Sequence, residues 1–236
     1  MGNMIYQTGT INSLLEAVYD GDKTVAQVMQ HGDFGLGTFD FIDGEFIACD
    51  GVCYRADMDG VIAIAEPAIK TPFAVVSKFN AHKRLTLSNL SFQQLEHKLE
   101  EQFNSRNIVY AIKVIAKFKQ ISFRSEACPT RSKLKLSELL PKIQRSFTRD
   151  NVEGILVGVW YPKYMANINV SGFHFHFVDS QRQFGGHVFA FDLLDGEAQI
   201  QEIHSLQIDL INTTDFHNAD LDQDHSDAVA SVEKMR

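Results

Sequence analysis

The sequence predicts an α+β fold: a β-rich, two-lobed single chain with mixed and antiparallel sheets, a few flanking helices and a metal site on strands of the second half. Three observations support this prediction. From residue 34 onward, short runs of β-branched and aromatic residues alternate with the turn dipeptide Asp-Gly, at residues 43–44, 50–51 and 59–60. Helical periodicity is confined to a few short segments. A histidine-rich, strand-like run lies in the second half.

In the first 135 residues, helices and strands are predicted from the spacing of apolar residues and from the capping and turn residues at their ends. Thr24 and Ser91 suit the N-cap position, and Gln94 follows Ser91 at the spacing of a capping box. Asp50-Gly51 suits the tight turn of a β-hairpin. We therefore predict an amphipathic segment at residues 12–18, helices at residues 24–29 and 92–103, and strands at residues 45–49, 52–56, 73–79 and 108–118.

The next part of the chain has one helical pattern and then reads as β-structure. The helical pattern covers residues 136–147 and has Pro141 near its start. Alternating and continuous apolar runs follow, separated by turn residues. We predict strands at residues 155–161, 168–178, 187–194 and 198–210.

These elements suggest a division of the chain into three parts. We expect an N-terminal α/β lobe at residues 1–135, a C-terminal β-rich metal-binding lobe at residues 136–212 and an acidic tail at residues 213–236. The composition of the tail favours a solvated extension. Its small apolar residues 228–232 favour a terminal turn that folds back on the active site and carries Glu233 inward.

Composition limits the classes of function. The chain has 236 residues, 44% hydrophobic residues and a net charge of −8, which argues against a nucleic-acid partner because phosphate binding needs a basic patch. No apolar run is long enough for a membrane helix, and we expect no membrane partner. The N-terminal residues lack the pattern of a secretory signal. Three cysteines, an odd number, suggest reduced thiols and a cytoplasmic protein.

The motif Phe173-His174-Phe175-His176-Phe177 predicts a metal site built on a strand. Side chains alternate between the two faces of a strand, so both histidines share one face while the phenylalanines take the core side. After a predicted hairpin loop that ends in Gly-Gly, His187 would return antiparallel beside the pair. Three neutral imidazoles suit Zn²⁺ or another late first-row divalent ion and leave room for substrate. Because imidazoles carry no compensating charge, carboxylates are expected nearby.

Several longer motifs resemble those of the α-acetolactate decarboxylase family, in the same order along the chain. They are VYDGD at residues 18–22, HGDFGLGTF at residues 31–39, DGE at residues 43–45, KTPF at residues 70–73, FRS at residues 123–125, and GFHFHF followed by GGH at residues 172–187. The resemblance extends from about residue 5 to about residue 212. One departure is Ser125-Glu126-Ala127-Cys128, which lacks the pattern expected after Arg124.

The resemblance implies roles for seven residues. His174, His176 and His187 would hold a zinc ion, and Glu45 would lie at the metal and the substrate. Arg124 would be an active-site cation that binds substrate, Thr38 would line the pocket, and Glu233 would reach the metal from the tail. The implied reaction is the metal-dependent decarboxylation of 2-acetolactate, a β-keto acid, to acetoin and CO₂.

Two other classes of function remain open from the residues alone. A cupin-like metal-dependent oxygenase also uses a His-x-His pair and a distant histidine, but it normally has a glutamate shortly after the pair, and residues 177–186 contain none. The third class is a non-catalytic β-rich binding domain whose histidines lie in the core. The sequence leaves the oligomeric state open, with a homodimer among the possibilities.

Overall fold

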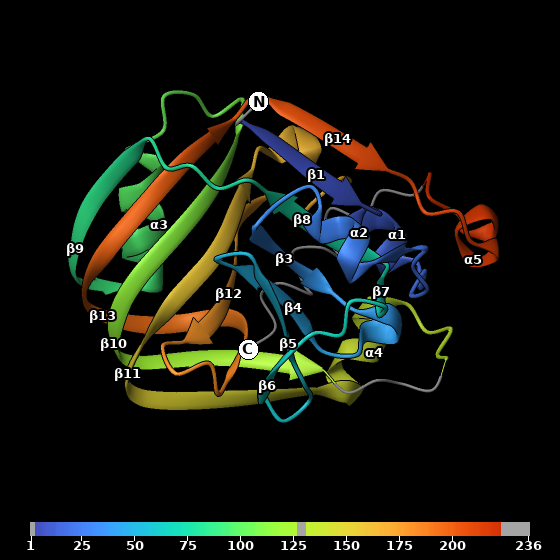
Figure 1. Cartoon of the computed structure of the whole chain (residues 1–236), viewed down its shortest axis with the longest axis horizontal. Coiled ribbons are helices and arrows are strands. Elements are labelled where there is room, and N and C mark those ends of the chain that lie inside the picture. Colours follow the sequence, from blue (N-terminus) through green and yellow to red (C-terminus); the bar gives the residue numbers. More distant parts are fainter. Residues whose placement is uncertain (1–2, 127–130, 223–236) are drawn as a thin grey trace.

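Two large β-sheets make up most of the protein (Figure 1). The computed structural model describes residues 3–126 and 131–222. One sheet has seven strands in the spatial order β14-β1-β8-β3-β4-β5-β6. Their bounds are β1 Met4–Thr8, β3 Phe34–Thr38, β4 Glu45–Cys49, β5 Val52–Ala56, β6 Ile62–Ile64, β8 Phe73–Ser77 and β14 Ser205–Asp209.

The second sheet has five strands in the order β10-β11-β12-β13-β9, and β10 also pairs with β13. All its pairings are antiparallel, whereas β1 pairs with β14 in parallel in the first sheet. The predicted class of mixed and antiparallel sheets with few helices is therefore confirmed. The bounds are β9 Lys83–Ser91, β10 Val109–Glu126, β11 Gln144–Tyr161, β12 Gly172–Asp179 and β13 Gly185–Ile203, with a separate two-stranded ribbon of β2 Lys23–Thr24 and β7 Lys70–Thr71.

Short helices flank the sheets. The predicted N-cap at Thr24 and the predicted capping box at Ser91 are present, and Thr24 also forms a capping box, with Gln27, that was not predicted. None of the helices within the described ranges is long and apolar enough to cross a membrane. The helices are α1 Ile11–Leu15, α2 Val25–Met29, α3 Phe92–Glu100, α4 Leu136–Ile143 and α5 Thr214–Asn218, with 3-10 turns at Asp40–Ile42 and Lys163–Met165.

Each sheet contains strands from both sides of the expected boundary between residues 135 and 136. Strands β9 and β10 precede this boundary and belong to the five-stranded sheet, while β14 follows it and extends the seven-stranded sheet. The helix predicted at residues 136–147 ends at Ile143, because β11 begins at Gln144 and pairs along its length with β10. The two sheets are thus interwoven in sequence.

The buried apolar residues form several core clusters. One cluster joins α3 to the five-stranded sheet and contains Phe175 and Phe177, as the alternation predicted. A second core combines residues of both sheets, such as Leu36 and Ile47 from the first and Val157 from the second. A third joins α1 to α4. The site described below lies where these layers meet.

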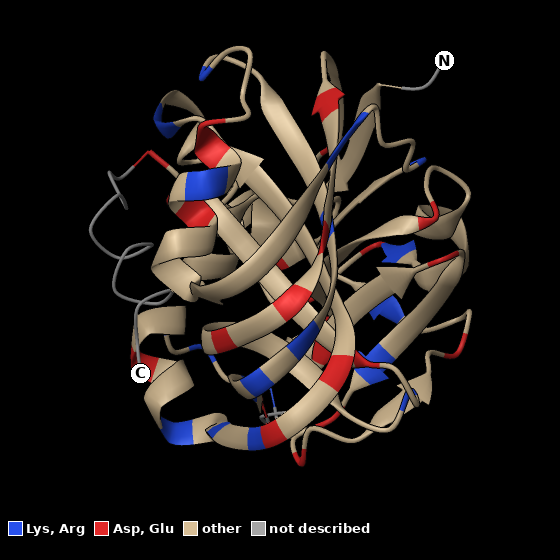
Figure 2. Cartoon of the chain, turned by 90° about the vertical axis from the view of Figure 1, so that its left-hand side faces the viewer, with Lys and Arg blue, Asp and Glu red and all other residues tan. Residues whose placement is uncertain are grey.

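Charged residues of both signs are interspersed along the strands (Figure 2). Several form cross-strand pairs, including Arg84 with Glu197 and Lys117 with Glu153. On the viewed side, acidic and basic residues are mixed and are not gathered by sign.

Candidate metal centre

The three histidines converge as the strand pattern predicted. His174 and His176 are two residues apart on β12, and His176 lies directly opposite His187 of β13 in the antiparallel register. His174 Nε2 is 3.1 Å from His176 Nε2 and 3.2 Å from His187 Nδ1. Each side chain is buried, and one nitrogen of each lies within 4.8 Å of the others. These are the described residues that could hold a metal ion.

The geometry of the three nitrogens fits a divalent ion. Zinc–nitrogen bonds of about 2.0–2.1 Å in a tetrahedral site place ligand nitrogens about 3.3 Å apart, close to the observed spacings. His176 Nδ1 lies 3.0 Å from the carbonyl oxygen of Phe46. A carbonyl only accepts hydrogen bonds, so Nδ1 carries the proton and Nε2 keeps its lone pair for a metal. The residues therefore suit Zn²⁺ or a similar ion.

The surroundings keep the imidazoles neutral. Burial, and then the positive charge of Arg124, lower the pKa of His174 to about 3. Burial and then the charge of His174 hold the pKa of His176 well below its usual value, and burial and then Arg124 do the same for His187. Neutral imidazoles have a free lone pair, which is the form that binds metal.

Glu45 brings a carboxylate to the histidines from the other sheet. It is the first residue of β4 and is only 5% exposed. Its Oε2 lies 3.3 Å from His176 Nε2, the nitrogen that faces the other ligands. This carboxylate can partly neutralise a bound cation. Thr38, its partner across β3 and β4, is buried and donates from Oγ1 to the carbonyl oxygen of Gly44 at 2.9 Å.

Arg124 is a buried cation of the same site. It lies within β10, opposite His187 in the register of β10 and β13, and is 2% exposed. Arg124 lines the same cavity as the three histidines, and its positive charge contributes to lowering the pKa of each of them. A side chain this deeply buried is not part of an ordinary surface ion pair.

These side chains line one small pocket of about 60 Å³. Its polar side consists of Thr38, Glu45, Arg124, Glu126 and the three histidines, and its apolar side consists of Ile11, Leu14, Ile42, Phe73, Leu136 and Leu140. Six of the seven residues singled out in the sequence are therefore brought together. The seventh, Glu233, lies outside the described residues.

Sequence reasoning missed Glu126 and the apolar wall. The sequence predicts that the strand after residue 108 ends at residue 118, whereas β10 continues to Glu126. Arg124 and Glu126 are two residues apart on this strand and share one face. Strand alternation carried past residue 118 is the signal that identifies Glu126. The wall of Leu136 and Leu140 depends on how α4 packs against α1, which no local pattern reveals.

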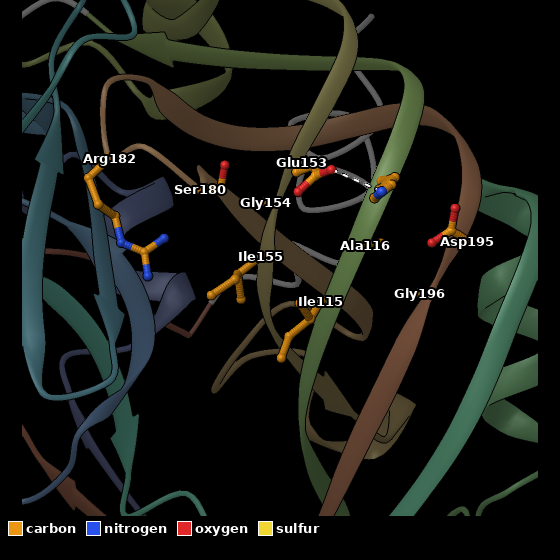
Figure 3. Close-up of a pocket in the computed structure, with 10 residues that line it drawn as sticks. Ile115, Ala116, Glu153, Gly154, Ile155, Ser180, Arg182, Asp195 and Gly196 are labelled. Carbon is orange, nitrogen blue, oxygen red and sulfur yellow. Dashed lines mark ion pairs between the residues drawn. The ribbon is translucent and has the colours of Figure 1, made fainter.

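A second hollow, of about 320 Å³, lies elsewhere on the five-stranded sheet (Figure 3). It is lined by Ile115 and Ile155, by Arg182 and by the ion pair of Lys117 with Glu153, 3.1 Å apart. No histidine is among the described residues that line it, and the Lys117 and Glu153 side chains are exposed. Its residues are much less suited to hold a metal ion than the histidine pocket.

The fold and pocket define a class: two-sheet β-proteins with a buried three-histidine group suited to a metal ion beside a small, mixed polar and apolar cavity. Comparison with known proteins identifies the family of the chain. The family model described as alpha-acetolactate decarboxylase matches residues 5–223. The chain belongs to the α-acetolactate decarboxylase family, whose members are carboxy-lyases.

Individual relatives agree with this assignment. The chain is 38% identical to the alpha-acetolactate decarboxylase of Klebsiella aerogenes over 98% of this chain and 89% of that protein. It is 36% identical to that of Brevibacillus brevis over 99% of this chain and 82% of the relative. The crystal structure of the Bacillus subtilis strain 168 enzyme superposes with a TM-score of 0.95 at 34% identity, covering 98% of this chain and 100% of that one.

Proposed function

We propose that this chain converts 2-acetolactate to acetoin and CO₂ with the help of a divalent ion, Zn²⁺ in the first instance, held by His174, His176 and His187. The observation that carries the proposal is the convergence of three buried, neutral imidazole nitrogens at 3.1 and 3.2 Å beside a buried carboxylate and a buried guanidinium. Family membership supplies the substrate class.

The reaction makes three demands on the site. The carboxylate must be oriented so that the C1–C2 bond can break. As C1 departs in CO₂, the electron pair of that bond stays on C2 and spreads to the ketone oxygen, where the negative charge must be stabilised. A proton must then reach C2 to give acetoin. A divalent ion held by the histidines supplies a Lewis acid for substrate oxygens. The remaining demands fall on the chain's own side chains.

Arg124 is suited to hold the substrate carboxylate. A guanidinium offers two parallel N–H donors to a carboxylate, and it stays charged even when buried. Because Arg124 lies across the strand register from His187, a carboxylate on it would place the rest of a small substrate against the histidines. The position of the guanidinium therefore defines which end of the substrate faces the ion.

Glu45 is suited to handle the proton. Its carboxylate is buried and next to His176 Nε2, so it is shielded from bulk water and close to the reacting atoms. Thr38 lies beside it, with its hydroxyl oriented by Gly44, and presents a fixed contact to substrate. We include Glu233 as a further carboxylate reaching the ion, on the strength of the resemblance alone.

The apolar side of the pocket suits the two methyl groups of acetolactate. Leu14 of α1, Leu140 of α4 and their neighbours face the polar side of the cavity and exclude water from it. Exclusion of water strengthens the electrostatic contacts made by Arg124 and the ion. A cavity of about 60 Å³ admits a small molecule rather than a polymer.

A direct assay tests this proposal. Purified protein is incubated with acetolactate, and acetoin and CO₂ are measured before metal removal, after it, and after addition of Zn²⁺. We expect His174→Ala to lose most of its metal, by elemental analysis, and its activity. His97→Ala, which changes an exposed histidine on α3, should retain both. Acetoin formation by metal-free protein, or full metal retention by active His174→Ala, would contradict the proposal.

We also propose a cytoplasmic location. Cys49 and Cys53 are free and buried on the β4–β5 hairpin, where they belong to different cores and therefore face opposite sides of the sheet. Burial raises the pKa of the Cys49 thiol to about 12 and raises that of Cys53 as well, so both stay protonated and inert. Unpaired structural thiols suit a reducing compartment.

A further inference from the structure

One buried glutamine connects the segments that form the apolar side and the ion-binding side of the pocket. Gln7 lies on β1, is 0% exposed and is not among the described residues that line the cavity. Burial of a side-chain amide is costly unless its hydrogen-bonding groups have partners inside the protein. The partners of Gln7 therefore show which segments it holds together.

The amide nitrogen of Gln7 binds the backbone around the start of α1. It donates to the carbonyl oxygen of Gly9 and to that of Ile168, each at 2.8 Å. The Ile168 carbonyl also accepts from the backbone N–H of Ile11, at 3.0 Å. Ile11 is the first residue of α1 and lines the pocket, and Gly9 directly precedes Thr10, the N-cap of this helix. The amide nitrogen thus fixes the position at which α1 begins.

The amide oxygen of Gln7 binds the segment that leads to the histidines. It accepts from the Tyr161 hydroxyl at 3.3 Å and from Asn169 Nδ2 at 2.9 Å. Tyr161 is the last residue of β11 and pairs with Gly172, the first residue of β12. Asn169 lies in the loop between these two strands, and β12 carries two of the three histidines. The oxygen is thus bonded to both flanks of the turn into the ion-binding strand.

These contacts use the whole hydrogen-bonding capacity of one side chain. A primary amide has two N–H donors and an oxygen with two lone pairs, and Gln7 employs all four. Val170, next to Asn169, packs in the same core cluster as Leu14 and Leu140 of the apolar side. The spacing between the apolar side and β12 therefore depends on a side chain that reaches from the other sheet.

We propose that Gln7 is a positioning residue, which fixes the apolar side of the pocket relative to β12 and so limits the size of the alkyl group at C2 of the substrate. The proposal rests on the proposed function for the identity of the substrate, and it adds how the same site selects among homologues. Acetolactate carries a methyl group at C2, and its next homologue carries an ethyl group there. One methylene is a difference that a pocket wall held at a fixed distance can detect.

Binding of unreactive acids tests the proposal independently of decarboxylation. 2-Hydroxyisobutyrate and 2-hydroxy-2-methylbutyrate each carry one carboxylate and one hydroxyl, and they differ by one methylene. Their dissociation constants are measured by calorimetry on zinc-loaded protein, for the parent, Gln7→Leu and Gln7→Glu. The matched control is Gln201→Leu, because Gln201 is equally buried and bonded to backbone groups but is not among the described residues that line the cavity.

We expect the parent to prefer the smaller acid by about tenfold or more, the lower end of what one methylene contributes in a close-fitting pocket. Gln7→Leu should reduce this preference to about threefold or less, roughly half of that discrimination in free energy, because α1 and the segment before β12 are no longer tied to each other. Gln7→Glu should also reduce it, since a carboxyl group donates at most one hydrogen bond where the amide donates two. Zinc content should stay at the parent level.

The control separates positioning from general stability. Gln201→Leu should keep the parent preference even where it lowers the melting temperature as much as Gln7→Leu does. An equal change of preference in the two variants would mean that destabilisation alone is the cause, and the role of Gln7 would be overturned. A parent-like preference in folded, zinc-loaded Gln7→Leu, or equal binding of the two acids by the parent, would overturn it as well.

A milder variant covers the case in which Gln7→Leu does not fold. Tyr161→Phe removes one of the four hydrogen bonds and keeps the ring, so it should lower the preference for the smaller acid in the same direction by a smaller factor. An unchanged preference in Tyr161→Phe and in Gln7→Glu would then refute the role. If the parent binds these acids but forms no acetoin from acetolactate, the proposed function fails while the comparison of the two acids still decides the role of Gln7.

Discussion

Arg124 is a case in which the environment of a residue, rather than its type, determines its role. Arginine at the end of a strand commonly forms a solvent-exposed ion pair worth little energy. Here the guanidinium is 2% exposed and lies opposite His187, and its charge depresses the pKa of all three histidines. A buried, permanently charged, planar group beside a metal-binding triad is suited to a single anionic ligand.

Arg124→Lys tests the need for that planar group. We expect the variant to keep its fold and its metal but to lose one or more orders of magnitude in turnover, about 1.4 kcal/mol of barrier per tenfold, because an ammonium cannot make two parallel hydrogen bonds to a carboxylate. Steady-state kinetics with acetolactate and elemental analysis provide the readouts. Arg84→Lys, on the exposed face of β9, is the control. Turnover within about twofold of the parent would refute the bidentate role.

At the scale of elements, the approach of β13 to β10 positions His187. Gly186 precedes His187 and has a φ of +155°, and a Cβ placed on it would lie 2.3 Å from the carbonyl oxygen of Arg124. A side chain at this position would therefore push apart the two strands that carry His187 and Arg124. The glycine is required by close backbone packing, not by a turn.

Gly186→Ala should accordingly impair stability and the site together. We expect a loss of about 1–3 kcal/mol in the free energy of unfolding from overpacking, together with weaker zinc binding in competition with a chelator. Gly51→Ala is the matched control, because Gly51 also has a positive φ, of +82°, but nothing lies within 4 Å of its added Cβ. Equal effects of the two substitutions on zinc affinity would mean that strand separation at Gly186 is not the cause.

Elements fixed by local chemistry were predicted best. The hairpin of Glu45–Cys49 and Val52–Ala56 has the predicted bounds, because Asp50 and Gly51 both adopt the positive φ of its tight turn. The shared face of His174 and His176 follows from strand alternation alone. Pairing between distant strands determines the bounds that were not predicted. Strand β13 runs unbroken across the gap expected between two predicted strands. Strand β10 continues to Glu126 because β11 and β13 pair with it on either side.

For the molecule as a whole, the site depends on both sheets. Thr38 and Glu45 come from the seven-stranded sheet, and the histidines and Arg124 come from the five-stranded one. Residues from position 11 to position 187 line a single cavity. Chain segments far apart in sequence must therefore be in place before the pocket exists.

The acidic tail, residues 213–236, gives a prediction that concerns the whole molecule. If Glu233 supplies a carboxylate to the ion, Glu233→Ala and deletion of residues 228–236 should both weaken zinc binding and reduce acetoin formation, because the ion loses a negatively charged neighbour. Asp227→Ala removes a tail carboxylate outside that segment and should behave like the parent. Parent-level rates in both the Glu233 variant and the truncated protein would assign the carboxylate function to Glu45 alone.

The separate origin of the two sides of the pocket matters for redesign. The apolar side is built mainly by α1 and α4, whereas the ion-binding nitrogens stand on β12 and β13. Leu136 and Leu140 can therefore be trimmed to make space for longer alkyl chains without altering any nitrogen that faces the ion. Substrate size and reaction chemistry can thus be changed separately. A library of variants confined to these two helices would vary the size of the accepted substrate while the ion-binding residues stay constant.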